Sequence, residues 1–296
     1  MYRTWLETFE LPSAADDILF TVGLKETCYN GLYPFGLFPD KELCEISCSP
    51  VTIFYGRNGC GKTTLLNVIA EKTEAERHSE FNGSGLFSQY VEMCRMRMKR
   101  RPETCQILTS DDVFDYVLNM RTLNAGIDMR REELFEEYYE KKNSNVKLTS
   151  MQDYEAYKES QTAKRRTKSR YTRERLPEPV TMHSNGENAM RYFIEQIGED
   201  GLYLLDEPEN SLSVTKQQEL ASFLYDSARH FGCQFLIATH SPILLSMKDA
   251  LIYDLDETPV TTKKWTELEN VRTWFRFFEV HRDEFLKQGQ ENDPTQ

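Results

Sequence analysis

The stretch Val51-Thr-Ile-Phe-Tyr-Gly-Arg-Asn-Gly-Cys-Gly-Lys-Thr63 joins an apolar run to a glycine-rich segment. The β-branched and aromatic run Val51–Tyr55, bounded by Pro50 and Gly56, predicts a buried strand. Residues 56–63 fit the pattern G-x-x-x-x-G-K-[ST] at every fixed position, and the apolar spacing of residues 64–72 predicts a helix. Strand, glycine loop and helix in this order predict a phosphate-binding turn.

The chemistry of this turn follows from its residue types. Glycines let the backbone wrap closely around a phosphate, and the helix N-terminus adds a positive dipole at the same point. Lys62 would neutralise the β- and γ-phosphates of ATP, and the Thr63 hydroxyl would bind Mg²⁺. The candidate ATP-contacting residues of the loop are Gly56, Arg57, Asn58, Gly59, Cys60, Gly61, Lys62, Thr63 and Thr64.

A second buried strand ends in two carboxylates. The segment Leu202-Tyr-Leu-Leu-Asp-Glu-Pro208 is apolar before Asp206, which lies 144 residues after Lys62. Apolar strands that alternate with helices predict a parallel sheet, whose strands end at one edge. There Asp206 would hold the Mg²⁺ shell through water, and Glu207 would orient or deprotonate the attacking water. The pattern predicts hydrolysis of ATP.

A third buried strand, Gln234-Phe-Leu-Ile-Ala-Thr239, leads into His240, 34 residues after Asp206. A histidine at the carboxyl edge of a sheet, beside a γ-phosphate, could sense that phosphate by hydrogen bonding. We therefore group His240 with Lys62 and Glu207 as the candidate catalytic residues.

The segment His183-Ser-Asn-Gly-Glu187 precedes an expected helix over residues 188–196 and lies 22 residues before Asp206. One interpretation is helix capping by Ser184. The other is an anion site built from the serine hydroxyl, the N–H of Gly186 and the helix N-terminus. We favour the anion site because of its order and spacing relative to the other three motifs. Its candidate residues are Ser184, Asn185, Gly186 and Glu187.

Together the four motifs resemble the ABC-type ATPases. Residues 184–187 resemble that family's signature motif in the form S-[GN]-G-[EQ], and His240 resembles its switch histidine. The run Asp206-Glu-Pro-Glu-Asn-Ser-Leu212 is closer to the SMC, RecF and OLD-like branch, which includes small bacterial AAA-family ATPases, some of them encoded in phage-defence loci. The resemblance covers residues 15–110 and 180–256.

The resemblance implies a head-to-tail homodimer, in which ATP on the glycine loop of one copy is covered by residues 184–187 of the other. Hydrolysis would release that contact. Ser213 stands where the D-loop of transporter relatives ends in Asp, which puts that contact between subunits in doubt. The Q-loop glutamine has two candidates, Gln89 and Gln106; we favour Gln106 as the further metal ligand because it ends an expected strand and leads into a helix. Tyr33 is a candidate for stacking on adenine, and a buried aromatic of the loop is the alternative.

We predict an α/β fold of the P-loop NTPase type: an ABC-ATPase head with a mostly parallel sheet flanked by helices, and a helical insertion before the signature motif. The expected parts are an N-terminal lobe (1–110), a charged insertion (111–183), a lobe with the signature, carboxylates and histidine (184–256), and a C-terminal helix and tail (257–296). For the insertion, a disordered, solvated loop is the alternative. Residues 18–24 are expected to form an early strand, and the aromatics of a last helix at about 267–286 are expected to be core contacts.

Composition narrows the class of protein. The apolar fraction of 39% is globular, and the net charge of −12 argues against a protein coated in nucleic acid but leaves room for a local basic groove. Seven cysteines without a C-x-x-C pair favour reduced thiols. The N-terminus has no signal-peptide pattern. The sequence contains no run of about 18 apolar residues, the length that a membrane span needs. We therefore expect a cytoplasmic protein without membrane insertion.

Two basic runs are candidates for partner binding: residues 95–101, Arg95-Met-Arg-Met-Lys-Arg-Arg101, and residues 164–175, which begin at Lys164 and end at Arg175. Their partner would be nucleic acid or an effector protein, and a solvated surface is the bland alternative. The leading hypothesis is an ATPase whose dimer closure switches such a partner, in genome maintenance or antiviral defence. A transporter cassette and a slow-turnover regulatory scaffold are the rival classes.

Overall fold

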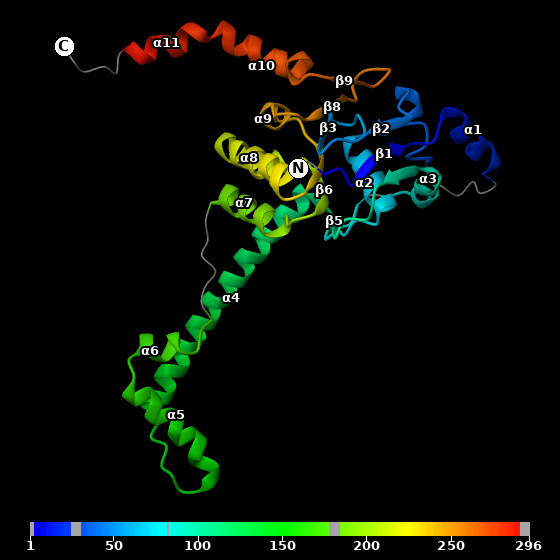
Figure 1. The fold of residues 1–296 in the computed structure, drawn as a ribbon. Helices are drawn as coiled ribbons and strands as arrows, with labels where there is room; N and C mark the ends of the chain where they lie inside the picture. The colour runs from blue at the N-terminus through cyan, green and yellow to red at the C-terminus, as the bar shows by residue number, and fades with distance from the viewer. Residues whose placement is uncertain (1–2, 25–30, 82, 178–183, 291–296) are drawn as a thin grey trace. The chain divides into compact units, whose positions relative to one another are not determined.

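The computed structural model describes residues 3–24, 31–81, 83–177 and 184–290, and the chain divides into two compact units (Figure 1). The first unit contains the residues up to Val113 and those from Asn185 onward. The second unit is Phe114–Ser184. All strands from β1 to β9 belong to the first unit, which therefore carries the sheet that the motifs predict.

The first unit is built on a six-stranded sheet with the strand order β5-β6-β7-β3-β8-β9. Neighbouring strands from β5 to β8 are parallel, and β9 is antiparallel to β8. The apolar runs of β3 and β7 are buried at every position, as a sheet covered on both faces requires. The fold is the predicted α/β class with a mostly parallel sheet. Its strands are β3 (Val51–Tyr55), β5 (Thr104–Thr109), β6 (Gly201–Asp206), β7 (Gln234–Ala238), β8 (Leu251–Asp254) and β9 (Thr261–Lys263).

Helices cover both faces of this sheet. Helix α2 (Lys62–Thr73) packs on β5, β6 and β7, with α3 (Phe87–Met93) beside it, whereas α8 (Val214–His230) packs against β7 together with α7 (Asn185–Gln196) and α9 (Pro242–Leu245). Figure 1 shows α7 and α8 on one side of the strands and α2 and α3 on the other. Short 3₁₀ turns follow several loops: η1 (Pro39–Lys41), η3 (Pro208–Ser211) and η4 (Trp265–Glu267).

A smaller antiparallel sheet has the order β2-β1-β4, with β1 at Leu6–Glu10, β2 at Glu45–Ser47 and β4 at Arg95–Met98. The buried side chain of Gln234, at the start of β7, links this sheet to the large one. Its Oε1 accepts hydrogen bonds from the backbone N–H groups of Trp5 and Leu6, both at 2.8 Å. A buried amide in this position fixes the small sheet at the amino end of β7.

Residues 18–24 do not form the expected strand. Helix α1 (Ala14–Gly23) occupies this region, and Ser13 and Asp16 form a capping box at its start. The β-branched and aromatic composition suggested a strand, but the cap satisfies the orphan N–H groups of a helix. The prediction failed because local capping outweighed composition.

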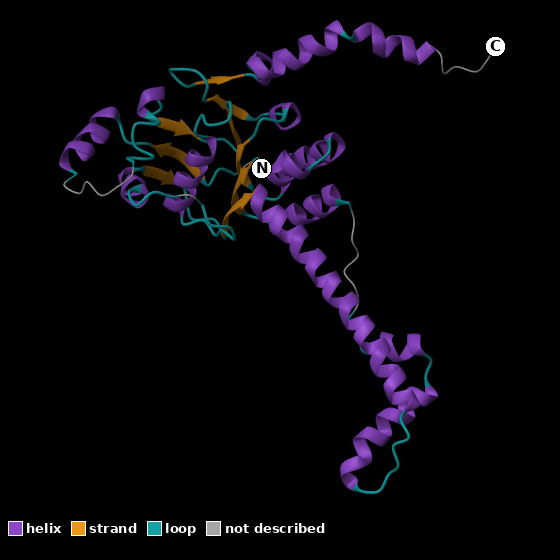
Figure 2. Ribbon diagram, turned by 180° about the vertical axis from the view of Figure 1, so that it is seen from behind, coloured by secondary structure: helices purple, strands orange, loops and turns teal. Residues whose placement is uncertain are grey.

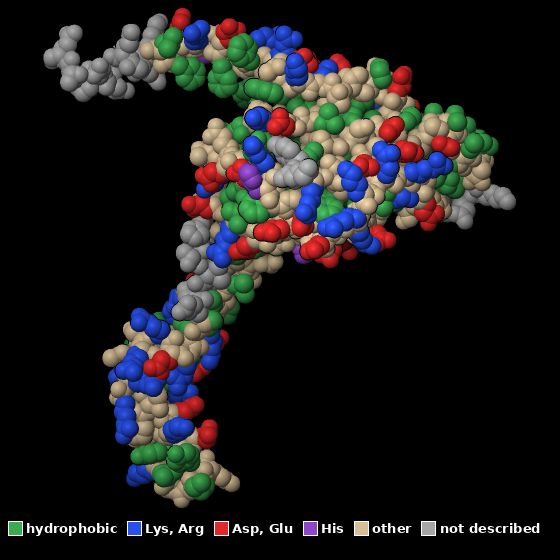
Figure 3. All heavy atoms as spheres, in the orientation of Figure 1, with side chains coloured by type: hydrophobic (Ala, Val, Ile, Leu, Met, Phe, Trp, Pro, Cys, Tyr) green, Lys and Arg blue, Asp and Glu red, His purple; other side chains and the backbone are tan. Residues whose placement is uncertain are grey.

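The C-terminal aromatics are not core residues. Helices α10 (Glu269–Val280) and α11 (Arg282–Gln290) bury Val271, but the other large apolar side chains are exposed, from 47% for Trp274 to 80% for Val280. Figure 3 shows hydrophobic side chains along these helices. The expectation of core contacts was therefore wrong. The exposed side chains are Trp274, Phe275, Phe277, Phe278, Val280, Phe285 and Leu286.

The second unit is helical in its described part (Figure 2). Helix α4 (Ser110–Asn143) begins in the first unit and continues into the second, followed by η2 (Met151–Asp153), α5 (Tyr154–Arg165) and α6 (Lys168–Arg173). A small core holds these helices together, so the insertion is not simply a solvated loop. Its buried residues are Leu134, Tyr138, Ala163 and Tyr171.

Candidate functional site

The glycine loop between β3 and α2 adopts backbone conformations that favour glycine. Gly59 and Gly61 have φ values of 81° and 101°, in the left-handed region. A Cβ at Gly61 would also lie 3.1 Å from the Leu37 side chain. Gly61 precedes α2 and makes no side-chain cap, so the first N–H groups of this helix can serve a ligand.

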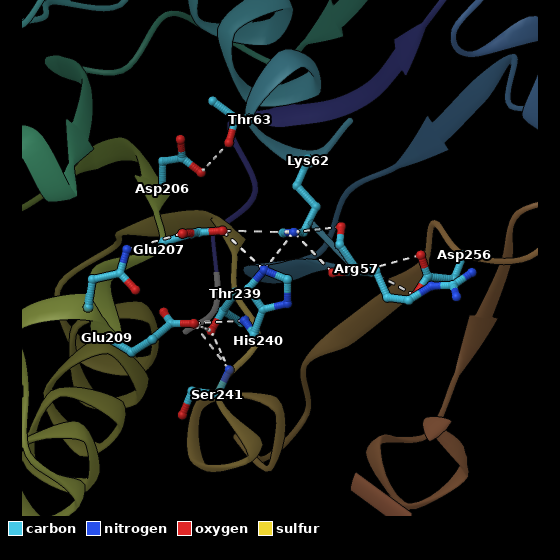
Figure 4. A network of polar contacts seen from close by, with 12 residues as sticks. Arg57, Lys62, Thr63, Asp206, Glu207, Glu209, Thr239, His240, Ser241 and Asp256 are labelled. Carbon is cyan, nitrogen blue, oxygen red and sulfur yellow. Dashed lines mark hydrogen bonds and ion pairs between the residues drawn. The ribbon is translucent and has the colours of Figure 1, made fainter. Parts of the chain in front are cut away.

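Lys62 is the central cation of the site, and its side chain is only 4% exposed. Its Nζ donates to the carbonyl oxygens of Gly56 and Arg57 at 3.0 and 3.3 Å. It also lies 2.8 Å from His240 Nε2 and 3.8 Å from Glu207 Oε1 (Figure 4). The loop bends its own lysine inward, and the lysine meets both other candidate catalytic residues there.

The adjacent threonine meets the first carboxylate. Thr63 Oγ1 donates to Asp206 Oδ1 at 3.1 Å, across 143 residues of sequence. Burial raises the pKa of Asp206 to about 6; the Thr63 hydrogen bond lowers it and the charge of Glu207 raises it further. Among the described residues, no group of three or more His, Cys, Asp or Glu side chains is suited to a metal ion. A hydroxyl and a single carboxylate would leave most positions around Mg²⁺ to phosphate and water.

Glu207 follows β6 and has a left-handed backbone, with φ of 47°. Its two carboxylate oxygens have different partners. Oε2 accepts from the side-chain amide of Asn210 at 3.1 Å, and Oε1 lies 3.1 Å from His240 Nε2. The sheet register pairs Asp206 with Ala238 of β7, which is why the ends of β6 and β7 bring Glu207 and His240 together.

Sequence reasoning assigned no role to Glu209, which lies within this network. Its Oε1 accepts from Thr239 Oγ1 at 2.6 Å, from the backbone N–H of His240 at 2.7 Å and from that of Ser241 at 3.1 Å. The signal in the sequence is the second glutamate of Asp206-Glu-Pro-Glu209, followed by the polar segment Thr239-His-Ser241 after the next strand. That signal becomes meaningful only when β6 and β7 are known to be neighbours.

Tyr33 lies beside the glycine loop. Its hydroxyl donates to Thr64 Oγ1 at 2.8 Å, and its side chain is 41% exposed. It borders a pocket of about 510 Å³, a volume suited to a nucleotide. The pocket is lined by Tyr33, Leu37, Asn58, Gly59, Gly61, Lys62, Thr63, Thr64 and Glu207. The side chain of Arg57 is exposed. Its backbone N–H donates to both carboxylate oxygens of Asp256 at 2.9 Å.

The four residues 184–187 lie at the start of α7, away from the lining of this pocket. Ser184 is exposed and precedes the helix, which begins at Asn185. A Cβ at Gly186 would lie 3.7 Å from the carbonyl oxygen of Ser211, in the turn after Glu207. His183 lies outside the described residues.

Gln106 does not reach the site. It lies in the middle of β5, where it pairs with Tyr203, three residues before Asp206 on the neighbouring strand. The side chain is buried, donates to Gln196 Oε1 at 3.2 Å and lies 3.2 Å from His78 Nε2. The prediction of Gln106 as a metal ligand is therefore wrong, because the strand continues to Thr109. Gln89 is exposed on α3.

The basic runs lie in different surroundings. Residues 95–101 form the edge strand β4 and the segment after it. Arg97 on the strand and Lys99 after it both pair with Glu7 at 3.1 Å, and Arg101 pairs with Glu74 at 2.8 Å. Residues 164–175 belong to the second unit, where Arg166 and Arg170 both pair with Glu174. Figure 3 shows Lys and Arg side chains gathered along the second unit.

A parallel sheet whose glycine loop, carboxylates and histidine meet at one edge defines a P-loop NTPase. The family model of ABC transporters matches residues 44–210, more than half of the chain, so the chain belongs to this family. A second model, an AAA domain of the AbiEii-toxin, type IV toxin–antitoxin kind, matches residues 184–246. The first match contains the glycine loop and both carboxylates, and the second contains the signature-like segment and His240.

Solved structures similar in fold include the Smc head domain of Pyrococcus furiosus with an extended coiled coil bound to the C-terminal domain of ScpA (TM-score 0.41, 12% identity, 92% of this chain and 99% of that one). The SMC head domain of Thermotoga maritima is also similar (0.39, 12%, 88% and 99%), as is a metal-chelate type ABC transporter in an inward-facing conformation (0.35, 16%, 76% and 76%). No curated protein matches the chain. Within the described ranges, no helix has the length and apolarity needed to cross a membrane.

Proposed function

We propose that this chain binds Mg·ATP at the edge formed by β3, β6 and β7 and hydrolyses it to ADP and phosphate. The observation that carries the proposal is the convergence on Lys62, whose buried ammonium lies within 4 Å of both His240 and Glu207. Three segments far apart in the sequence supply these groups. Membership of the ABC family supports the same reaction.

The residues at this edge fit the substrate. The uncapped start of α2 and the loop N–H groups suit the phosphates, and Lys62 would exchange its carbonyl partners for phosphate oxygens. Thr63 and Asp206 would hold Mg²⁺; burial raises the pKa of Asp206, and the Thr63 hydrogen bond and the charge of Lys62 offset this only in part. When bound, Mg²⁺ would neutralise charge on the phosphates.

Glu207 is the proposed general base. The Asn210 amide holds one carboxylate oxygen, which leaves the other facing His240 and Lys62. From there Glu207 would orient a water molecule for attack on the γ-phosphate and accept its proton. His240 would donate a hydrogen bond to the γ-phosphate and so report whether it is present.

We further propose that the site is completed by a second copy. Residues 184–187 do not line the pocket of their own chain, although their spacing matches the ABC signature motif. In a head-to-tail dimer they would cover the nucleotide of the partner subunit, and hydrolysis would release the contact. The chain would belong to the SMC, RecF and OLD-like branch, and its closure would switch a partner, nucleic acid or effector protein, bound by the basic runs.

The Glu207→Gln variant tests both parts of the proposal. The wild type should hydrolyse ATP only with Mg²⁺, and E207Q should lose about 100-fold or more in kcat, because a general base contributes this much. It should still bind ATP and accumulate as a dimer, measured by light scattering with and without Mg·ATP. Glu219→Gln, on the exposed surface of α8 where the carboxylate pairs with Lys216, is the matched control.

Three outcomes would each count against a different part of the proposal. An E207Q variant that stays monomeric at saturating Mg·ATP would exclude completion of the site by a second copy. An E207Q variant that hydrolyses ATP as fast as the wild type would exclude Glu207 as the base. A wild type that hydrolyses no ATP would overturn the ATPase itself.

A further inference from the structure

The side chain of Glu209 connects two parts of the site that come from different strands. It belongs to the turn η3, two residues after Glu207 at the end of β6. Its Oε1 accepts three hydrogen bonds from the segment Thr239–His240–Ser241, at the end of β7. Figure 4 shows these bonds converging on one carboxylate oxygen, next to the contact between His240 and Glu207.

These three hydrogen bonds are expected to be strong. The acceptor is a carboxylate, and two of the distances, 2.6 Å from Thr239 Oγ1 and 2.7 Å from the His240 N–H, are short. Hydrogen bonds to a charged acceptor are roughly twice as strong as those between neutral groups. Ser241 has further anchors, because its hydroxyl caps α9 and donates to Gln217 at 2.6 Å. For the backbone of His240, the carboxylate of Glu209 supplies the side-chain anchor.

We infer that Glu209 is a positioning residue that sets the His240 imidazole against Glu207 and Lys62. This inference rests on the proposed function, because positioning matters only if these groups act on ATP. Glu209 does not line the pocket, so it would act through His240 rather than on the nucleotide. Since Glu209 and the base Glu207 share one short turn, any movement of that turn would move His240 as well.

Loss of the Glu209 carboxylate should lower kcat but not the affinity for ATP. Without the Glu209 carboxylate, the imidazole would lose its fixed place, while the glycine loop and Lys62 would keep their phosphate contacts. Small misplacement of a catalytic group can cost on the order of 100-fold in rate. We therefore expect Glu209→Ala to lower kcat by roughly 10- to 100-fold and to leave the Kd for ATP within about threefold of the wild type.

Two further variants separate positioning from a general loss of structure. Glu209→Gln keeps a carbonyl oxygen that can accept the same three bonds, so it should retain most of the wild-type kcat. Thr239→Val removes the hydroxyl that donates to Glu209 and that accepts from the Ser241 N–H at 3.0 Å, but it keeps the two backbone bonds to Glu209, so its kcat should fall between the wild type and E209A. Glu219→Ala, which removes an exposed carboxylate, is the matched control.

The test combines steady-state kinetics, calorimetric ATP binding and hydrogen exchange of the peptide that contains residues 239–241. The expected result is a lower kcat in E209A at unchanged Kd, with faster exchange of the His240 and Ser241 amides. An unchanged kcat, or a Kd and Tm that deteriorate in parallel with kcat in E209A and E209Q alike, would overturn the positioning role. Exchange that stays at the wild-type rate in E209A would overturn it as well.

Hydrogen exchange also distinguishes this inference from the ATPase proposal. If the wild type hydrolysed no ATP, the proposed function would fail on that result alone. Faster exchange at residues 239–241 in E209A would then still establish that Glu209 holds the segment, and the catalytic part of the inference would fall together with the proposed function.

Discussion

The edge of the large sheet and the helical unit Phe114–Ser184 both carry dense charge, but they arrange it differently. At the edge, Lys62 meets His240 across 178 residues of sequence and Thr63 meets Asp206 across 143. In the helical unit, several of the ion pairs join residues three or four positions apart on one helix, as in Arg130 with Glu133.

This difference explains why one region reveals a chemistry and the other does not. Pairs between distant segments exist only because the fold brings strand ends together, so their geometry can be selected for a ligand. Exposed pairs one helical turn apart form on almost any charged helix and contribute about 0–1 kcal/mol each. The sheet edge thus specifies ATP chemistry, while the helical unit specifies only a charged surface.

The largest effect should come from removing the cation at the centre of the sheet edge. Lys62→Ala takes away the buried ammonium that faces Gly56 and Glu207, and with it the charge-assisted bonds proposed for the phosphates. We expect the Kd for ATP to rise by about 100-fold or more, measured by calorimetry.

Lys72→Ala is the matched control, because Lys72 lies at the other end of the same helix and donates to the Glu92 carbonyl. Its affinity for ATP should equal that of the wild type. An unchanged Kd for ATP in K62A would mean that the charges at the sheet edge are no more specific for ATP than those of the helical unit.

Much of the sheet edge was predictable because the relevant signals are local. The apolar run at β3, the glycine pattern and the spacing of α2 are contiguous, and the structure places them as strand, loop and helix. The strands β6 and β7 were likewise readable as buried apolar runs. A parallel sheet then requires their carboxyl ends to meet at one edge.

The errors arose where an outcome depends on what packs against a segment. Gln106 was assigned to a strand end from sequence, but the strand continues for three more residues, which moves its side chain into the interior. The aromatic spacing of α10 is the same whether its apolar face is covered or exposed, so periodicity could not show that Phe275 is exposed. The role of Glu209 depends on strand order, which no single segment contains.

A moderate effect should distinguish the two regions by their response to pH. The native pKa of Asp206, about 6, lies above the ordinary aspartate value of 3.8, so the native state binds the proton more tightly than the unfolded state. Without Mg²⁺, the ionisation of this carboxylate therefore begins to destabilise the fold above about pH 4, and the full penalty is reached above about pH 6.

Asp206→Asn removes that titration. In EDTA its Tm should exceed that of the wild type by about 3 °C at pH 7.5, and the difference should shrink to roughly half near pH 5 and vanish near pH 4. Calorimetry of the two proteins across this range is the measurement, with Asp128→Asn, an exposed aspartate of the helical unit, as control. A Tm difference that does not change with pH would mean that burial does not govern this carboxylate.

The smallest effect concerns the helical unit, where charges without a carboxylate partner can be compared with paired ones. Arg165 and Arg173 are exposed, and no ion pair is found for them within the described residues. Arg166 and Arg170 both pair with Glu174. If this surface binds nucleic acid, Arg165 and Arg173 should make more phosphate contacts than the two arginines that pair with Glu174.

The double variant R165Q/R173Q should lower the slope of log affinity against log salt by about 2, because each lost phosphate contact removes about one unit. R166Q/R170Q is the matched pair with the same change in charge, and its slope should fall by less. The measurement is fluorescence anisotropy with a labelled DNA duplex and a labelled single-stranded RNA over a salt series. Equal slopes for both variants would show that local pairing does not govern this surface. Wild-type binding that is absent at low salt would exclude nucleic acid and leave an effector protein or a solvated surface without a partner.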